Sequence, residues 1–237
     1  MIDWHSHILP CMDDGSQSVE ESIEMLDIQA REGADTVIAT PHFYADDESA
    51  KDFLQRRDEA YRMLLPHLTG SHPAVVLGAE VRYYKGISRL KELKLLRIGQ
   101  SKLLLLEMPC SRWSDYTLCE LMELSGNGGT RIVLAHAERY LFLQSKPAQR
   151  QILDGNFLIQ INSSCLTDFG KRHKAISGLK KGNIHFIGSD CHGAEHRPPR
   201  LKKAFEIIEK RFGAEFIGQM DIFGRSMLYE KAKVNPL

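Results

Sequence analysis

Short apolar runs, rich in Leu or in β-branched side chains, alternate along this chain with longer segments in which apolar positions recur at helical spacing. Most of the short runs are apolar at consecutive positions, as expected for parallel strands that are covered on both faces. The alternation is typical of parallel strands joined by crossover helices, and it predicts about seven such units. The predicted strands are Met1–His5, Thr36–Thr40, Ala74–Gly78, Leu103–Leu106, Arg131–Leu134, Phe157–Ile161 and Ile184–Ile187.

The longer segments carry helix start and stop signals. After the first strand, Ser18 and Glu21 have the spacing of a capping box, and Gly33 ends the amphipathic segment that follows. No repeat, low-complexity tract or Gly/Ser linker marks a domain boundary. We therefore expect a single domain spanning residues 1–237, folded as an α/β barrel. Further helices are predicted at Lys51–Leu65, Asp115–Leu124 and Leu201–Phe212.

Composition limits the cellular compartment and the binding partners that we expect for this protein. Lys plus Arg number 31, as do Asp plus Glu, so no global field attracts nucleic acid or an anionic membrane. The N-terminus has no basic segment followed by an apolar one, and no run approaches the ~20 apolar residues of a spanning helix. Five cysteines without a CxxC pair argue against a disulfide framework and a thiolate zinc site. We expect a cytoplasmic protein without membrane insertion and without a nucleic-acid partner.

Chemically distinctive residues follow nearly every predicted strand. In a barrel of parallel strands the carboxyl ends of all strands lie on one face, so residues far apart in the sequence meet there. The first strand ends in a His-x-His pair, whose two imidazoles lie on one side of an extended chain. The residues at the strand ends are His5, His7, His42, Glu80, Glu107, His136, Asp190 and His192.

Each of these residues also has an ordinary explanation by itself. A lone His-x-His pair is at least as often two unrelated histidines, and a single Glu is usually a solvated carboxylate. Glu80 and Glu107, however, each follow an apolar run, and an unpaired charge at a partly dry barrel end is costly. Cations shared by imidazoles and carboxylates explain all of these residues together. Such ligands without thiolate suit Zn²⁺, Mn²⁺ or Fe²⁺ and fit Ca²⁺ poorly.

Six motifs in the chain resemble those of one protein family. They are HSHILPCMDDGS at 5–16, ATPH at 39–42, GAEVRYY at 78–84, LLLLEMP at 103–109, AHAER at 135–139 and IGSDCHGAEHRPP at 187–199. In type and order they resemble the PHP (polymerase and histidinol phosphatase) superfamily, and most closely its bacterial capsule-regulating protein-tyrosine phosphatases, the CpsB/YwqE-like group. The resemblance implies a distorted (β/α)7 barrel. It also implies a metal-dependent phosphatase that hydrolyses phosphotyrosine on a bacterial tyrosine autokinase controlling capsule or exopolysaccharide synthesis.

The resemblance further implies two or three divalent ions, with Mn²⁺ preferred to Zn²⁺ and Fe²⁺. The ligands of the first ion would be His5, His7, Glu80 and Asp190. The ligands of the second would be Glu80, Glu107 and His136. The third would take His42, His192 and one carboxylate of the Asp13–Asp14 pair. Asp14 is favoured, but spacing does not separate two adjacent aspartates.

Arg139 comes just after His136, and Arg197 comes just after the segment from Asp190 to His192. Both are predicted to bind phosphate, because a guanidinium matches phosphate oxygens bidentately. The alternative for either residue is a surface ion pair, for instance between Arg139 and Glu138. Selectivity for phosphotyrosine would also require an apolar or aromatic wall. The candidates are Phe43, Tyr44, Tyr83 and Tyr84, and a place in the barrel core explains them equally well.

Three other functions compete with this interpretation. Cys191 and Arg197 fit the C-x5-R pattern of cysteine-dependent tyrosine phosphatases, but a thiolate mechanism has no use for Asp190 and His192 or for the other strand ends. The same metal site could serve a small-molecule phosphatase such as a histidinol phosphatase. A non-catalytic or nuclease-like metal-binding module is disfavoured by the balanced charge.

Overall fold

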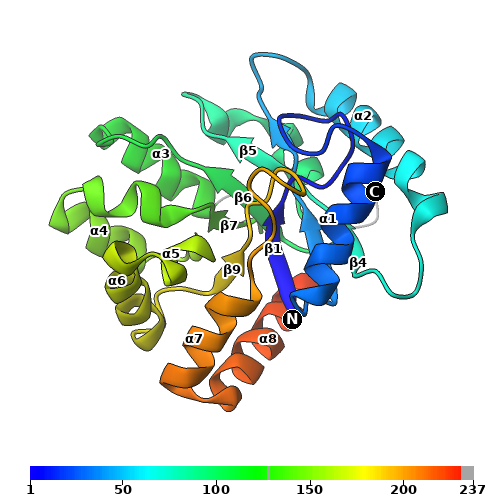
Figure 1. Cartoon of the computed structure of the whole chain (residues 1–237). Helices are drawn as coiled ribbons and strands as arrows, with labels where there is room; N and C mark the ends of the chain where they lie inside the picture. Colours follow the sequence, from blue (N-terminus) through cyan, green and yellow to red (C-terminus); the bar gives the residue numbers. More distant parts are fainter. Residues whose placement is uncertain (127–128, 231–237) are drawn as a thin grey trace.

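The computed structural model describes residues 1–126 and 129–230, which Figure 1 traces from the first strand to the last helix. Within them nine strands pair in parallel, in the orders β1-β2-β4 and β3-β5-β6-β7-β8-β9. The strands are β1 (Ile2–Ser6), β2 (Thr36–Ala39), β3 (His42–Phe43), β4 (Ala74–Leu77), β5 (Glu80–Arg82), β6 (Leu103–Glu107), β7 (Arg131–Leu134), β8 (Leu158–Asn162) and β9 (Phe186–Gly188).

Helices connect nearly all of these strands. The α-helices are α1 (Val19–Arg31), α2 (Ala50–Leu64), α3 (Asp115–Gly126), α4 (Lys146–Leu153), α5 (Ser164–Thr167), α6 (Phe169–Lys180), α7 (Lys202–Phe212) and α8 (Ala214–Tyr229). The 3₁₀-helices are η1 (Leu65–His67), η2 (Ile87–Arg89), η3 (Lys91–Leu96), η4 (Ala137–Arg139) and η5 (Leu141–Leu143). No helix in the described part of the chain is both long and apolar enough to cross a membrane.

Two short strands, β3 and β5, lie just beyond two of the predicted strands and were not predicted. β2 passes through Thr40 and Pro41 into β3, and β4 passes through Gly78 and Ala79 into β5. Pro41 interrupts the ladder because it has no N–H to donate. The described residues therefore contain nine strands, two more than the seven predicted, and a strand lies at each predicted position.

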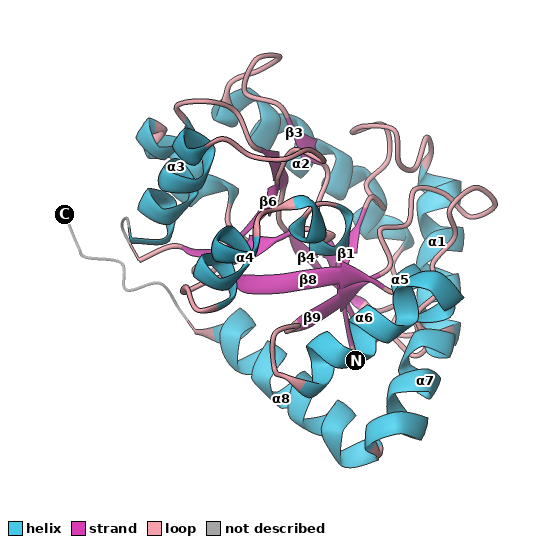
Figure 2. Ribbon diagram, turned by 90° about the vertical axis from the view of Figure 1, so that its left-hand side faces the viewer, coloured by secondary structure: helices cyan, strands magenta, loops and turns pink. Residues whose placement is uncertain are grey.

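The strands form a curled parallel layer in a mixed α/β fold, with strands in the middle and helices around them (Figure 2). The curl brings β9 beside β1. Ser6 and Cys191 form an isolated bridge, and the Asp190 N–H donates a hydrogen bond to the His5 carbonyl at 2.8 Å. The carboxyl ends of the first and last strands therefore lie side by side.

Two apolar clusters hold the curled layer together. Side chains alternate between the faces of a strand, so neighbouring residues of β6 belong to different clusters. Leu103 and Leu105 join an inner cluster with Trp4 of β1, whereas Leu104 and Leu106 join the larger cluster that includes residues of the helices. Full burial of each such side chain stabilises the fold by about 1.5–3 kcal/mol, which anchors the strand ends that carry the polar residues.

The start of α1 agrees with the capping signal in the sequence. The Ser18 hydroxyl accepts a hydrogen bond from the Glu21 N–H at 3.2 Å. The Glu21 carboxylate accepts from the Gln17 N–H at 2.8 Å rather than from Ser18, so the reciprocal half of the capping box lies one residue earlier than predicted. The other three predicted helices begin and end within two residues of their predicted bounds.

The last described helix, α8, was not predicted. Its Gly218 and Gly224 lower helix propensity and weaken the sequence signal. Gly224 lies against Trp4, where an added Cβ would stand 2.8 Å from the indole ring. The Trp4 ring in turn stacks on Phe186 with centroids 3.8 Å apart, and Leu228 of α8 joins the same inner cluster. Close packing against Trp4 therefore requires glycine at position 224, and the same glycine weakens the sequence signal for the helix.

His185, just before β9, makes the stability of this region depend on pH. Burial, and then the charge of Arg131, lower the pKa of His185 from 6.5 to about 4. Its Nδ1 accepts a hydrogen bond from the Ile159 N–H at 3.0 Å, so the folded protein holds the imidazole neutral. Between pH 6.5 and 4 only the unfolded chain binds the proton, and folding stability therefore falls as pH falls through this window.

We predict that the free energy of unfolding of the metal-free protein decreases by about 2 kcal/mol more in wild type than in His185→Gln between pH about 7 and about 4.5. Gln retains a hydrogen-bond acceptor but does not titrate. Urea denaturation at both pH values measures the difference, and His67→Gln, at an exposed histidine, is the control. Equal pH dependence in wild type and His185→Gln would contradict the assignment.

Candidate metal centre

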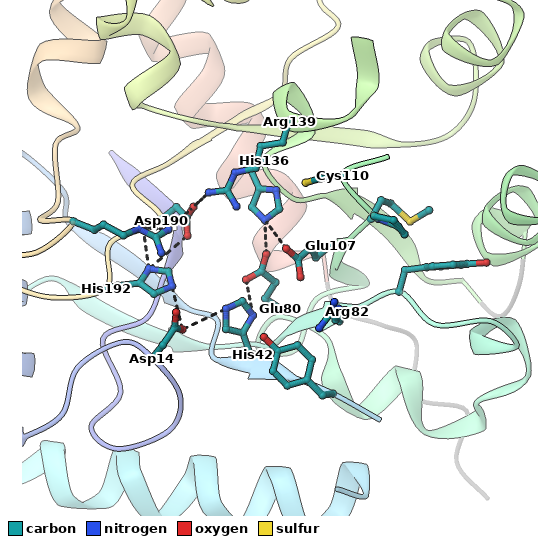
Figure 3. Close-up of a pocket in the computed structure, with 15 residues that line it drawn as sticks. Asp14, His42, Glu80, Arg82, Glu107, Cys110, His136, Arg139, Asp190 and His192 are labelled. Atoms are coloured by element: carbon teal, nitrogen blue, oxygen red, sulfur yellow. Dashed lines mark hydrogen bonds and ion pairs between the residues drawn. The ribbon is translucent and has the colours of Figure 1, made fainter. Parts of the chain in front are cut away.

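The residues predicted at the strand ends converge at the carboxyl ends of the strands. Six of them line a cavity of about 470 Å³, and Figure 3 shows Arg139 beside them. Arg197 lines the same cavity. His5 and His7 are fully buried below it, and Glu80, His136 and Asp190 are almost fully buried. The register of β1 against β2 shifts between Asp3 and Ser6, a local irregularity of the kind that re-aims side chains beside functional sites.

His5, His7 and Asp190 form the deepest group of potential ligands. The two imidazole Nε2 atoms are 3.1 Å apart, and each lies 3.7 Å from Asp190 Oδ1. Glu80 Oε2 lies 3.1 Å from His5 Nε2 and 3.4 Å from His7 Nε2. The geometry thus brings together the four residues that the resemblance assigns to the first ion.

Glu80 also joins a second group with His42 and Glu107. Its Oε2 is 3.1 Å from His42 Nδ1, and its Oε1 is 2.8 Å from His136 Nε2. His136 Nε2 lies 3.5 Å from Glu107 Oε1. The second predicted set is therefore assembled around Glu80, with His42 as a neighbour that the sequence placed only in the third set.

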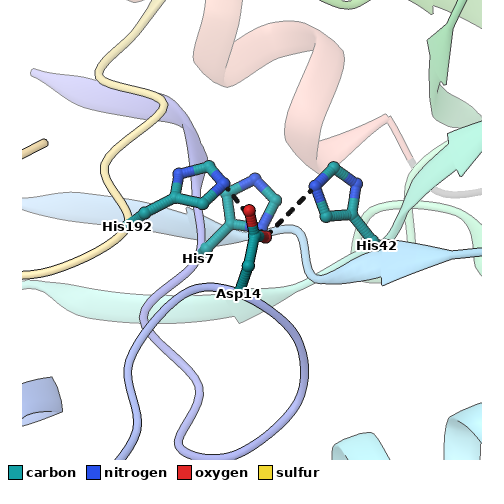
Figure 4. Close-up of side chains that lie close together, drawn as sticks. All are labelled: His7, Asp14, His42 and His192. Carbon is teal, nitrogen blue, oxygen red and sulfur yellow. Dashed lines mark ion pairs between the residues drawn. The ribbon is translucent and has the colours of Figure 1, made fainter.

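A third group comprises His7, Asp14, His42 and His192 (Figure 4). Asp14 Oδ1 lies 3.5 Å from His42 Nε2 and 3.3 Å from His192 Nε2. The Asp14 side chain is 68% exposed and lines the cavity with His42 and His192, whereas His7 is buried. The structure adds His7 to the predicted third set.

The structure separates the roles of the adjacent Asp13 and Asp14. The Asp13 carboxylate accepts hydrogen bonds from His7 Nδ1 at 2.7 Å, from the His42 N–H at 2.8 Å and from the Gly15 N–H at 2.9 Å. Gly15 permits this tight loop, since an added Cβ would stand 2.3 Å from the His7 carbonyl oxygen. Asp13 therefore orients two imidazole-bearing residues from behind, and Asp14 remains available to a cation.

We predict that Asp13→Asn weakens Mn²⁺ binding by about 10- to 100-fold, because Asn has no charge and only one acceptor oxygen, so it cannot accept from His7, His42 and Gly15 as Asp13 does. Calorimetric titration of the metal-free protein measures the change. Asp47→Asn, at an exposed aspartate, is the matched control. An unchanged affinity in Asp13→Asn would show that His7 needs no orienting partner.

The centre is a buried anion surrounded by imidazoles. Burial raises the pKa of Glu80, but His5, His136 and His7 outweigh it and hold that pKa well below its usual range. Burial likewise opposes ionisation of Asp190, yet the neighbouring histidines and Arg139 lower its pKa to about 2. Both carboxylates are therefore ionised at neutral pH.

Burial also lowers the pKa of His42 and, together with His7 and Arg197, lowers the pKa of His192 to about 4. At neutral pH these two imidazoles are uncharged and keep a lone pair for a cation. Within residues 1–126 and 129–230, the buried atoms Glu80 Oε2 and His42 Nδ1 have no hydrogen-bond partner. Such atoms are costly unless something else satisfies them.

Divalent metal ions fit this donor set. Two ligands bonded to one tetrahedral ion at 2.0–2.1 Å lie about 3.3 Å apart, and the three donor pairs that Glu80 Oε2 makes with His5, His7 and His42 lie 3.1–3.4 Å apart. The three groups found in the described residues contain imidazoles and carboxylates and no thiolate. This chemistry suits transition metal ions better than Ca²⁺.

Three residues of the site have a left-handed backbone that non-glycine residues rarely adopt. φ is +31° at His136, +53° at Asp190 and +57° at Arg197. Each such conformation costs on the order of 1–3 kcal/mol and persists where the surrounding structure imposes it. Their concentration at one cavity is independent support for a functional site there.

Sequence reasoning missed two polar residues of β8 that support the centre. The Gln160 side-chain oxygen accepts from the His136 N–H at 2.6 Å and lies 3.3 Å from His5 Nδ1. The Asn162 amide donates to Asp190 Oδ2 at 2.6 Å. The signal was present, because two buried polar residues alternate along an apolar strand, but the predicted strand ended at Ile161, one residue short of Asn162.

Arg139 and Arg197 converge on Asp190. Each places its Nη2 within ion-pair distance of Asp190 Oδ2, at 2.5 Å and 2.9 Å respectively. The two guanidinium groups therefore meet a buried carboxylate rather than forming the surface ion pair with Glu138 considered from the sequence. Both line the cavity, and their other N–H groups remain available to an anion.

The predicted aromatic residues divide into two classes. Tyr44 and Tyr83 line the cavity, and burial together with Glu107 raises the pKa of Tyr44 to about 12, so its phenol is neutral. Phe43 is 1% exposed and packs edge-on against Phe53, so it belongs to the core. Tyr84 is half-buried outside the cavity lining. Among the residues that sequence analysis did not select, Arg82 stands over the Tyr44 ring at 5.4 Å.

Cys191 is placed away from the cavity. Its thiol is fully buried, and burial raises its pKa, which is opposite to the shift that a nucleophilic cysteine needs. The Gln29 amide nitrogen lies 3.8 Å from its sulfur. The C-x5-R pattern is therefore a coincidence of spacing.

The model of the family described as capsular polysaccharide synthesis, CpsB/CapC, matches residues 1–225 of the chain. The chain belongs to the CpsB/CapC family. The resemblance of its six motifs is thus confirmed over nearly the whole sequence. In this CpsB/CapC protein the motifs contribute all of the residues that surround the cavity as potential ligands.

Relatives of this CpsB/CapC protein include named enzymes. It is 33% identical over 224 residues to tyrosine-protein phosphatase YwqE from Bacillus subtilis, covering 91% of this chain and 86% of the relative. It is 31% identical over 234 residues to tyrosine-protein phosphatase CpsB from Streptococcus pneumoniae, covering 91% and 92%. A crystal structure from work on YwqE and CpsB, described as metal-dependent tyrosine phosphatases, matches 100% of this chain with a TM-score of 0.80 and 26% identity, covering 97% of the matched chain.

Proposed function

We propose that the protein is a metal-dependent protein-tyrosine phosphatase that hydrolyses phosphotyrosine. The observation that carries the proposal is a cavity whose lining combines members of all three groups of potential metal ligands with two arginines and two tyrosines. Relatives that match most of the chain are tyrosine phosphatases. A small-molecule activity such as that of a histidinol phosphatase gains no comparable support.

In this proposal the arginines bind the phosphoryl group. Arg139 and Arg197 stand at 38% and 48% side-chain exposure, and Asp190 holds each by only one nitrogen. Their remaining N–H groups donate to the phosphate oxygens and neutralise charge that develops there. Tyr44 and Tyr83 form the wall against which the phenyl ring of the substrate packs.

The three groups of ligands, centred on His7, Glu80 and Asp14, would hold the metal ions. The presence of three groups supports two or three ions. Mn²⁺ is our first choice, and Zn²⁺ or Fe²⁺ are alternatives with the same ligand preferences. Such ions make water a usable nucleophile near neutral pH. The phenolate of tyrosine leaves with a pKa near ~10, so the chain need not supply a strong general acid.

We extend the proposal to the fold and the biological setting. The bridge between Ser6 and Cys191 supports a distorted (β/α)7 barrel as the fold. The family match over residues 1–225 supports one domain over residues 1–237, of which 127–128 and 231–237 lie outside the described residues. A bacterial tyrosine autokinase that controls capsule or exopolysaccharide synthesis is the proposed substrate. A cytoplasmic location is proposed with it.

Phosphate release from a phosphotyrosine peptide and from histidinol phosphate tests the proposed function. We expect the peptide to have a kcat/KM at least about 10²-fold higher, since only its phenyl ring meets the tyrosine wall. EDTA should abolish turnover, and Mn²⁺ should restore it. Equal or faster turnover of histidinol phosphate, or full activity in EDTA, would refute the proposal.

Cys191→Ala separates the metal route from the thiol route. We predict that this variant keeps kcat/KM on the phosphotyrosine peptide within about threefold of wild type, because the buried thiol does not reach the cavity. The assay is run at saturating Mn²⁺, with thermal unfolding as the check on folding. Loss of activity in a folded Cys191→Ala protein would restore the cysteine mechanism.

A further inference from the structure

A second cavity, of about 520 Å³, lies beside the candidate metal centre between η4, η5, α4 and α6. We call it the α4–α6 groove. Its floor includes Ile159 and Ile161 of β8, both almost fully buried, and Phe142 and Leu143 at its edge are 46% and 51% exposed. Its volume falls in the range typical of ligand sites. No role in the metal centre accounts for this exposed apolar surface.

The lining of the α4–α6 groove is strongly basic although the whole chain is neutral. Four lysines and Arg139 face one acid, Glu138, which gives a net charge of +4 with His173 neutral. The lysines are Lys146, Lys171, Lys174 and Lys181, all exposed and none in an ion pair within the described residues. Lys174 stands over the Phe142 ring at 4.5 Å.

Arg139 belongs to both cavities, so the groove begins where the phosphate site ends. A protein chain whose phosphotyrosine enters the metal centre would therefore run past Arg139 toward the lysines. We propose that the α4–α6 groove docks acidic and apolar residues flanking the phosphotyrosine of the protein substrate, an inference that rests on the proposed function. The lysines attract the acidic side chains, and the apolar floor receives a neighbouring apolar one.

Two phosphotyrosine peptides of equal length test the proposal, one flanked by Glu and Leu and the other by Ser and Gly, with free phosphotyrosine as the substrate that cannot reach the groove. We expect wild type to prefer the acidic peptide by about 10-fold in kcat/KM, and more at low salt. Lys146→Gln combined with Lys174→Gln should abolish this preference and leave turnover of free phosphotyrosine within about twofold. The matched control combines Lys51→Gln with Lys94→Gln, two exposed lysines in α2 and η3; α2 lies on the other side of the molecule from α4 and α6 (Figure 1).

The outcomes distinguish this inference from the proposed function. If no phosphotyrosine substrate is hydrolysed, the proposed function fails. If all are hydrolysed but the groove variant keeps the preference for the acidic peptide, only docking fails. The last measurement is sedimentation of the protein with phosphatidylserine vesicles. If the groove variant loses vesicle binding but keeps the peptide preference, the lysines bind a membrane surface and the proposal is overturned.

Discussion

Glu80→Gln should lower kcat on a phosphotyrosine peptide by at least about 10³-fold at saturating Mn²⁺, which corresponds to about 4 kcal/mol of transition-state stabilisation. Glu80 is the residue that the deepest two groups share, since its Oε2 lies within 3.4 Å of His5, His7 and His42. Gln has the same shape but no negative charge, so the change removes the anion at the middle of the centre. We expect the circular dichroism spectrum of the variant to remain that of wild type.

Glu120→Gln is the matched control for this effect. Glu120 is also almost fully buried, and its carboxylate accepts hydrogen bonds from the Tyr83 hydroxyl at 2.7 Å and the Gly86 N–H at 2.8 Å, away from the ligand groups. Its substitution should reduce stability, because a buried hydrogen-bond partner is lost, and should change kcat by less than about tenfold. Wild-type turnover in Glu80→Gln would remove Glu80 from the centre and with it the proposed arrangement of ions.

Arg197→Gln and Arg139→Gln should each lower kcat/KM by about 10- to 150-fold, the equivalent of one charge-assisted hydrogen bond to phosphate. The metal content should stay at the wild-type level, because neither arginine belongs to a ligand group. The two residues act on one phosphoryl group, so the double variant should lose less than the product of the single effects. Steady-state kinetics and elemental analysis supply both measurements.

Weaker inhibition by inorganic phosphate would distinguish phosphate binding from a purely structural role. Arg56→Gln is the control, since Arg56 is 45% exposed, similar to Arg197, but pairs with Glu48 on the surface. Arginine variants that lose metal together with activity would instead show that the two arginines mainly hold Asp190 in place. Variants with unchanged phosphate inhibition would likewise contradict the assignment.

The sequence was sufficient to locate the strands and the residues that follow them. Hydrophobic periodicity is a local property, so every predicted strand position contains a strand and four helices begin and end close to prediction. Parallel pairing sends every carboxyl end to one face, and this rule brought His5, Glu80 and Asp190 together although they are far apart in sequence. The family resemblance supplied the activity.

Only the tertiary structure decided how individual side chains are used. Asp13 and Asp14 are chemically identical neighbours, and the tight loop at Gly15 is what turns Asp13 behind His7 and leaves Asp14 facing the cavity. The contacts of Gln160 and Asn162 with the centre, and of both arginines with Asp190, join segments that no local pattern relates. The position of a residue at the end of a strand places it on the carboxyl-end face of the sheet. The direction of its side chain, however, depends on backbone angles and on partners distant in the chain.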